Sequence, residues 1–167
     1  MGTGKTSLLV KKAREYVDKT GNYVYILDPQ GTFPVPEGYK SKFRFVKLDA
    51  HNMRAVFEYI CTLKDAMIIL DDARIYTDYA NTYLLDLCIN HRHRNIDVFI
   101  VYHTLYDVNK KLWQFAAHCY VFRVQDTWAE VKRRTSLAMD EQLFNQIKTL
   151  EKYHFLYFLF GNLQKSS

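Results

Sequence analysis

The sequence predicts an α/β fold with a mainly parallel central sheet that helices cover on both faces. Short runs of β-branched and aromatic residues alternate with helix-like segments along all 167 residues, and several runs are apolar at every position. Strands of that kind are buried on both faces, as in parallel sheets. In addition, a glycine-rich segment opens the chain before a helix-like stretch, and two adjacent acidic residues close one apolar run.

The expected elements follow one another regularly. Residues 6–19 carry apolar side chains at helical spacing before Gly21, which is typical of an amphipathic helix and its end. The alternation of apolar and basic residues in 43–48 favours a half-buried or edge strand. No repeat or linker divides the chain, so we expect one domain over residues 1–167. Further helices are expected at 52–63, 79–90, 108–115, 128–133 and 140–150, and strands at 23–27, 43–48, 66–70, 98–102, 119–124 and 155–160.

The composition is that of a folded protein with a basic surface. The net charge of +5 at pH 7 is compatible with a polyanionic partner. The 13 tyrosines and 11 phenylalanines are expected mainly in the core, with base stacking on a few exposed rings as the alternative. Cys61, Cys88 and Cys119 lie far apart in apolar segments, which favours buried, reduced thiols. No membrane span or signal peptide is visible, so we expect a soluble, cytoplasmic protein.

The first residues match the end of a phosphate-binding loop. The complete pattern is G-x-x-x-x-G-K-[ST] between a strand and a helix, and Gly4-Lys5-Thr6 supplies its last positions. Backbone N–H groups of such a loop wrap phosphates at the positive end of the helix dipole. Lys5 would contact the β- and γ-phosphates of ATP, the Thr6 hydroxyl would bind Mg²⁺, and Ser7 would hydrogen-bond the α-phosphate. The expected ATP-binding residues are Gly2, Thr3, Gly4, Lys5, Thr6 and Ser7.

The front of this pattern is absent from the chain. Its first glycine, and the strand that should lead into the loop, would fall before Met1. We therefore expect the first strand of the fold to be missing or truncated. The alternative interpretation of the segment is a glycine turn that caps a helix by chance.

Two carboxylates follow the apolar segment at 66–70. A strand that delivers Asp71 and Asp72 at its carboxyl end has the arrangement of a Walker B site. We assign Asp71 to the Mg²⁺ shell and Asp72 to the attacking water. The alternative is an acidic turn that caps the next helix. Together with the glycine loop, this motif predicts a three-layer P-loop NTPase of the RecA/ASCE-like type.

A basic cluster and a histidine flank the next expected strand. The cluster is His91-Arg92-His93-Arg94, and His103 follows the strand at its carboxyl end. His103 would lie beside the γ-phosphate, and Arg92 or Arg94 could act as an arginine finger on a neighbouring subunit. For the arginines, the alternative is a solvated charge at a helix C-terminus. Metal binding by the two histidines is disfavoured, because no cysteine or acidic partner adjoins them.

Several stretches together resemble the FtsK–HerA superfamily of P-loop ATPases. They are Gly4-Lys5-Thr6, I-L-D-P-Q-G at 26–31, I-L-D-D at 69–72 and N-H-R-H-R-N-I-D-V-F-I-V at 90–101. The closest match is the viral branch, the genome-packaging ATPases of double-jelly-roll viruses. The resemblance implies a ring-forming motor that moves double-stranded DNA, with Arg94 or Arg92 at the finger position. His103 stands where the family usually has Gln.

The resemblance makes a DNA-translocating ATPase the first hypothesis, working as a homo-oligomeric ring with a viral capsid or portal as further partner. Such a motor would act in the host cytoplasm or virion. It needs basic residues to grip the DNA backbone, and the candidates are Lys110, Lys111, Lys132, Arg133 and Arg134, with a solvated charge cluster as the alternative. A phage assembly or export ATPase similar to zonula occludens toxin is the second hypothesis. The third is an ATPase-like binding module that has lost catalysis.

Overall fold

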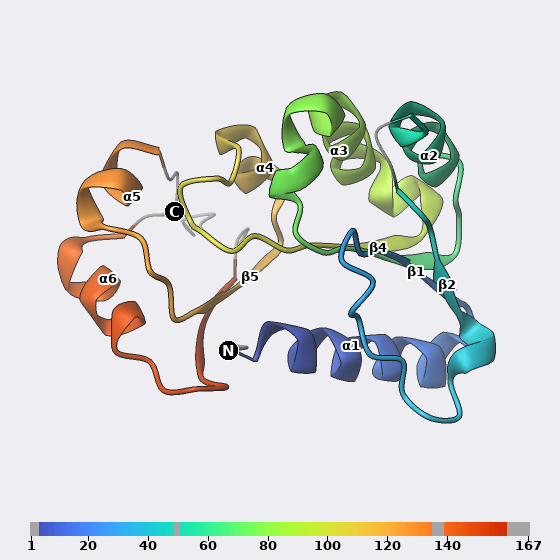
Figure 1. Cartoon of the computed structure of the whole chain (residues 1–167), viewed down its shortest axis with the longest axis horizontal. Helices are drawn as coiled ribbons and strands as arrows, with labels where there is room; N and C mark the ends of the chain where they lie inside the picture. Colours follow the sequence, from blue (N-terminus) through green and yellow to red (C-terminus); the bar gives the residue numbers. More distant parts are fainter. Residues whose placement is uncertain (1–3, 49–50, 135–138, 160–167) are drawn as a thin grey trace, which may run out of the picture. The chain divides into compact units, whose positions relative to one another are not determined.

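The computed structural model describes residues 4–48, 51–134 and 139–159, which form two compact units (Figure 1). The first, here named the sheet unit, is Thr6–Tyr102. The second, the C-terminal unit, contains Gly4, Lys5 and the described residues from His103 onward. Gly2, Thr3 and position 160 of the last expected strand lie outside the described residues. The single domain expected over residues 1–167 stays a prediction.

The sheet unit is built on four parallel strands in the order β2-β1-β3-β4. All five residues of the inner strand β3 are buried, because it has neighbours on both edges and helices on both faces. β2 is an edge strand, as its alternating sequence predicts. Their bounds are β1 Tyr23–Leu27, β2 Phe43–Phe45, β3 Ala66–Leu70 and β4 Ile96–Ile100.

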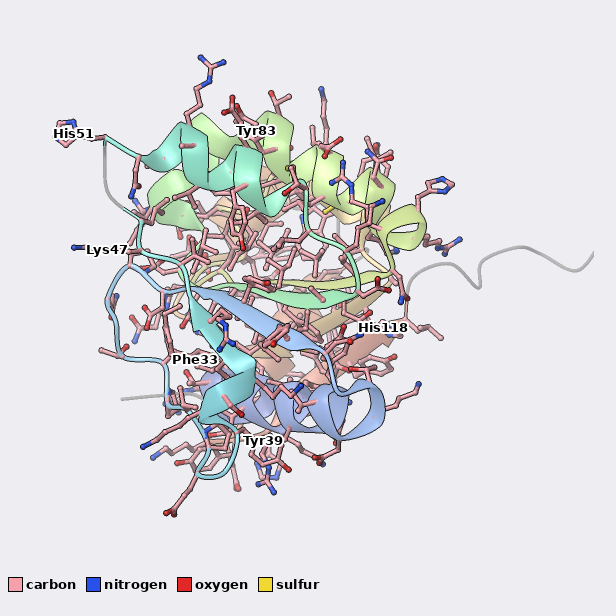
Figure 2. The ribbon with its side chains drawn as sticks, turned by 90° about the vertical axis from the view of Figure 1, so that its right-hand side faces the viewer. Phe33, Tyr39, Lys47, His51, Tyr83 and His118 are labelled. Carbon is pink, nitrogen blue, oxygen red and sulfur yellow. The ribbon has the colours of Figure 1, made fainter. Side chains whose placement is uncertain are left out.

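One face of this sheet is covered by helix α1 (Lys5–Thr20). Its buried residues Leu9, Ala13 and Val17 recur every four positions and form one apolar stripe. Burial of a side chain such as that of Leu9 contributes about 1.5–3 kcal/mol. Figure 2 shows Phe33 and Tyr39, from the connection between β1 and β2, on this same side. The stripe packs with Val24, Ile26, Phe33, Phe43, Met67 and Ile69.

The opposite face is covered by α2 (Met53–Ile60) and α3 (Arg74–Arg94) (Figure 1). Tyr83 of α3 stacks on Phe57 of α2 with ring centroids 5.8 Å apart, and it lies in this helical layer in Figure 2. The unit therefore has three layers, helix–sheet–helix, and the α/β class with a mainly parallel sheet is confirmed. The short helix η1 (Lys40–Lys42) leads into β2.

In the C-terminal unit, a two-stranded sheet packs with three helices. Strands β5 (His118–Phe122) and β6 (Phe155–Leu159) run antiparallel, with Tyr120 opposite Tyr157. The helices are α4 (Lys110–Phe115), α5 (Trp128–Arg134) and α6 (Glu141–Lys148). The apolar core of the unit contains Leu105, Trp113, Val121, Val131, Phe144 and Ile147.

The C-terminal boundary of α3 differs from the sequence expectation. α3 runs through the whole basic cluster to Arg94, whereas the sequence predicts its end at residue 90. Asn95 ends it with a left-handed backbone, φ 53°, and its side chain donates to Asp65 Oδ1 at 2.7 Å. Asparagine tolerates this conformation better than most residues. The following strand therefore begins at Ile96, two residues earlier than expected.

Candidate nucleotide-binding site

The start of α1 has the local features of an anion site. Lys5 is the first helical residue and is half-buried, while Thr6 and Ser7 in the same turn are exposed. The first turn contains no acidic residue. Because the first N–H groups of a helix lack intrahelical partners and carry the positive end of its dipole, this turn favours an anion such as phosphate.

Gly4 is required by its surroundings as well as by its backbone. Its φ of +106° is one that only glycine adopts readily. A Cβ at this position would lie 2.9 Å from Tyr153 Cα and 3.2 Å from Phe122 Cε1. Any side chain would therefore displace the neighbouring backbone, so the close approach fixes glycine directly before Lys5.

Within the sheet unit, the N-terminus of α1 lies at the carboxyl edge of the sheet (Figure 1). Gly21 and Asn22 connect α1 directly to β1, so the helix runs antiparallel to the strands. Its first residues therefore lie at the edge where β1, β3 and β4 end. In open parallel sheets this edge is where ligands bind.

Asp71 and Asp72 follow β3 at that edge, and the backbone holds both. The N–H of Asp71 donates to Leu27 O at 2.9 Å, and the N–H of Asp72 donates to Asp71 Oδ1 at 3.0 Å. Asp72 has a left-handed backbone, φ 49°. Strain of this kind in a non-glycine residue is often found at functional sites.

Gln30 lies in the candidate site, although the sequence motifs did not predict it as a site residue. Its Nε2 donates to Asp72 Oδ2 at 3.4 Å. Asp28 shapes the turn that presents Gln30, since its carboxylate accepts from the N–H groups of Gln30 at 2.9 Å and of Thr32 at 2.5 Å. The D-P-Q-G stretch at 28–31 was the available signal, because an aspartate before proline typically organises such a turn.

The donor set at this edge fits a hard cation. The Thr6 hydroxyl and the Asp71 carboxylate are oxygen donors, which Mg²⁺ prefers together with water and phosphate oxygens. In the part of the chain that the structure describes, no three His, Cys, Asp or Glu side chains gather in a metal cluster. A P-loop magnesium site does not require one, because substrate phosphates supply ligands.

The two arginines of the basic cluster have different environments. Arg92 is exposed in the last turn of α3. Arg94 Nη2 contacts Asp86 Oδ2 at 2.9 Å, and only 21% of the Arg94 side chain is exposed. Burial raises the pKa of Asp86, but hydrogen bonds from Arg94 and Asn90 outweigh it, so the pKa lies below its ordinary value.

The histidines of the cluster also differ. His91 Nδ1 lies 2.7 Å from Cys88 O in its own helix, whereas His93 is exposed.

The thiols of Cys61, Cys88 and Cys119 are all free, and burial raises the pKa of each to about 11. These cysteines therefore stay protonated at neutral pH and are poor nucleophiles.

In the C-terminal unit, the segment after His103 is anchored by a buried carboxylate. His103 itself is exposed. Asp126 is 4% exposed and its Oδ2 accepts from the N–H of Leu105 at 3.3 Å. Thr104 also donates to Asp107 within this turn. The backbone two residues after His103 is thus held in place.

Three of the predicted DNA-gripping residues have exposed side chains: Lys111 on α4, and Lys132 and Arg133 on α5. The side chains of Lys110 and Arg134 lie outside the described residues. Within the described ranges, no helix combines the length and apolar character needed to cross a membrane.

No protein-family model and no curated protein sequence matches the chain. Solved structures do match it. The DNA-packaging ATPase B204 of Sulfolobus turreted icosahedral virus aligns over 94% of this chain and 87% of its own, with a TM-score of 0.68 and 16% identity.

Two structures of the genome-packaging NTPase B204 of Sulfolobus turreted icosahedral virus 2 also match. Its complex with AMPPCP covers 95% of this chain and 89% of its own at a TM-score of 0.65 and 17% identity. Its complex with ATP-gammaS covers 94% and 86% at 0.69 and 14%. The chain therefore has the fold of these viral packaging ATPases.

Proposed function

We propose that this chain is an ATP-hydrolysing motor of the FtsK–HerA type that moves double-stranded DNA, most specifically a viral genome during packaging. The observation that carries the proposal is that the start of α1 and the two carboxylates after β3 lie at the same edge of the sheet. Thr6 and Ser7, in a first turn that is free of acidic residues, lie at the same edge of the sheet unit as Asp71 and Asp72. The fold shared with viral packaging ATPases supports the same function.

In the proposed mechanism, each residue has one role. Gly2, Thr3 and Gly4 wrap the phosphates, and Lys5 contacts the β- and γ-phosphates. Ser7 hydrogen-bonds the α-phosphate. Thr6 and Asp71 would hold Mg²⁺, and the ion would neutralise phosphate charge.

Asp72 orients the attacking water and accepts its proton. Its hydrogen bond from Gln30 keeps the carboxylate directed, and this supports a positioning role for Gln30. His103 donates a hydrogen bond near the γ-phosphate.

Of the two arginines, we assign the finger to Arg92. Its side chain is exposed at the C-terminal end of α3, whereas Arg94 is engaged by Asp86 in its own subunit. An exposed guanidinium can reach a neighbouring subunit without first breaking an ion pair. The proposal therefore includes a homo-oligomeric ring, and a capsid or portal protein as a further partner.

The first test is ATP turnover with and without double-stranded DNA. Lys5→Ala should abolish ATP binding, because the cation facing the β- and γ-phosphates is lost. Asp72→Asn should bind ATP but lose at least 100-fold in kcat, since general-base catalysis supplies about 10²–10⁴-fold. Unchanged hydrolysis in Asp72→Asn would contradict the assignment.

The same assay separates the competing functions. Turnover that DNA stimulates supports a translocase. Turnover indifferent to DNA would favour an assembly or export ATPase, and ATP binding without turnover in the wild type would favour a binding module.

Mixed rings test the arginine. An Arg92→Ala subunit keeps its ATP site but lacks the finger, and a Lys5→Ala subunit supplies the finger but binds no ATP. Mixing them should restore turnover above either variant alone, because a finger in trans is worth about 10³–10⁵-fold in kcat. Arg94→Ala, mixed in the same way, is the matched control. Because this variant keeps the proposed finger Arg92, mixing should give no turnover beyond that of Arg94→Ala alone. Absence of rescue for Arg92→Ala would remove it from this role.

A further inference from the structure

Tyr153 is an exposed aromatic ring beside the glycine loop. It lies between α6 and β6, and its Cα and Cδ1 are 2.9 and 3.0 Å from the position that a Cβ on Gly4 would take. Its side chain is nonetheless largely open, with 58% of the residue exposed. The ring is therefore next to the backbone expected to bind phosphate, and solvent reaches it.

Packing does not explain this placement. Tyr153 is absent from the apolar core of the C-terminal unit, which instead includes Leu150, Leu156 and Phe158 from the neighbouring segments. Its backbone is left-handed, φ 70°, which a bulky side chain rarely adopts. Residues held in such conformations cluster at ligand clamps, so the strained backbone of Tyr153 favours a ligand-contacting position.

The chemical class of the ligand follows from the glycine loop beside Tyr153. A nucleoside triphosphate whose phosphates lie on the N–H groups at Gly4 and Lys5 carries an aromatic base a short distance away. Every base has a π-face, and stacking on tyrosine tolerates different bases. Lys152 Nζ lies 4.8 Å from the ring centroid of Tyr153 and adds positive charge beside it.

We propose that Tyr153 is the stacking platform for the base of the bound nucleotide. The inference rests on the proposed function, since it assumes that the glycine loop binds the phosphates. Stacking without hydrogen-bond readout favours the larger purine rings over pyrimidines and discriminates weakly between adenine and guanine. The site should therefore take purine nucleoside triphosphates in general.

The experiment compares Tyr153→Ala, Tyr153→Phe and Tyr157→Ala. Tyr157 is the matched control: it is a tyrosine of adjacent β6, 47% exposed, whose ring packs with Tyr120 and His118. Binding of a non-hydrolysable ATP analogue and of inorganic tripolyphosphate is measured by calorimetry. KM values for ATP, GTP and CTP are measured in parallel.

Tyr153→Ala should weaken analogue binding and raise the KM for ATP about tenfold, with tripolyphosphate affinity unchanged. It should also reduce the ratio of the KM for CTP to the KM for ATP. Tyr153→Phe keeps the π-face and should resemble the wild type, as should Tyr157→Ala.

Two outcomes would overturn the inference alone: equal analogue affinity in the wild type and Tyr153→Ala, or parallel loss of analogue and tripolyphosphate binding. The second would mean that Tyr153 only shapes the glycine loop. Failure of the wild type to bind either ligand would instead overturn the proposed function, and the inference with it.

Discussion

Asp126 is a buried carboxyl group whose two oxygens have different environments. Oδ2 accepts from Leu105, whereas Oδ1 has no hydrogen-bond partner among the described residues. Burial raises the pKa of Asp126 above its ordinary value, although the N–H of Leu105 opposes the shift. The fold therefore binds a proton at this site more tightly than the unfolded chain does.

The sign of the pH effect follows from this pKa. The stability that protonated Asp126 contributes is fully present below about pH 4, the usual aspartate value, and is lost as pH rises through the raised pKa. Asp126→Asn keeps an acceptor for Leu105 without the buried charge. It should exceed the wild type in unfolding free energy at pH 7 by about 1 kcal/mol, with the difference shrinking toward pH 4.

Urea unfolding at pH 4, 5.5 and 7 measures this difference. Asp126→Ala is the control, and it should be less stable than the wild type at every pH because the N–H of Leu105 loses its acceptor. An Asn variant less stable than the wild type at pH 7 would show that the charged form is favoured in the fold.

For single residues, the sequence identifies candidate site residues better than it predicts their contacts. Asp71 and Asp72 stand out because they directly end an apolar strand. The hydrogen bond from Gln30 could not be foreseen, since it joins residues 42 positions apart and depends on how the Asp28 turn folds. The ion pair of Arg94 was equally hidden, because Asp86 lies eight residues earlier and the partners face each other only in a helix that continues through the cluster.

At the scale of single elements, the end of α3 decides where the basic cluster points. The N–H of Asn95 bonds to Arg92 O, and its side chain connects α3 to Asp65, just before β3. The connection is reinforced by the N–H of Asp65, which donates to Arg94 O at 3.0 Å. The helix end is thus fixed to the start of the strand that carries the carboxylates.

Substitutions at Asn95 should separate the contribution of its left-handed backbone from that of its side-chain hydrogen bond to Asp65. Asn95→Ala places a Cβ residue in the left-handed region and removes the bond to Asp65, so it should lower the unfolding free energy by about 2 kcal/mol. Asn95→Gly removes only the side-chain bond and should cost about 1 kcal/mol. Chemical unfolding followed by circular dichroism measures both. Equal losses in the two variants would mean that the backbone conformation contributes little.

The two inner strands have the bounds that the sequence predicts, whereas β2, β4 and β5 do not. β1 and β3 begin and end where their apolar runs do, because polar residues flank each run on both sides. α3 was expected to be shorter at both ends. It starts after Ala73, which provides no side-chain cap, and its basic last turn resembles a loop in sequence, although the two arginines suit a helix C-terminus.

For the whole molecule, the basic net charge is the property that bears on the proposed binding of DNA. Affinity for duplex DNA should fall steeply with salt, because each phosphate contact releases counterions. Replacing Lys132 and Arg133 with alanine should reduce the slope of log K against log salt by about 2, without changing sequence preference. Fluorescence anisotropy with two unrelated duplexes measures this slope.

Lys11→Ala is the matched control for that experiment. Lys11 is also an exposed helical lysine, but Glu15 lies 4.0 Å away and offsets its charge. Its replacement should leave the slope nearly unchanged. Equal effects of the two replacements would indicate that total charge, rather than α5, grips the backbone.

The layered architecture was predictable because continuous apolar strands require cover on both faces. The antiparallel pairing of β5 with β6 was not, since isolated apolar runs carry no direction. The division into two units was also hidden, because no change of composition marks residue 103.

The left-handed backbone of Asp72 lowers the stability of the fold at a residue that we propose is needed for ATP hydrolysis. Glycine at this position would relieve about 1 kcal/mol of strain, and asparagine would also fit the conformation more easily. Both would remove the carboxylate that we propose activates the attacking water. A laboratory selection for thermal tolerance alone should therefore enrich inactive sequences here, as expected for a position where activity is maintained at the expense of stability.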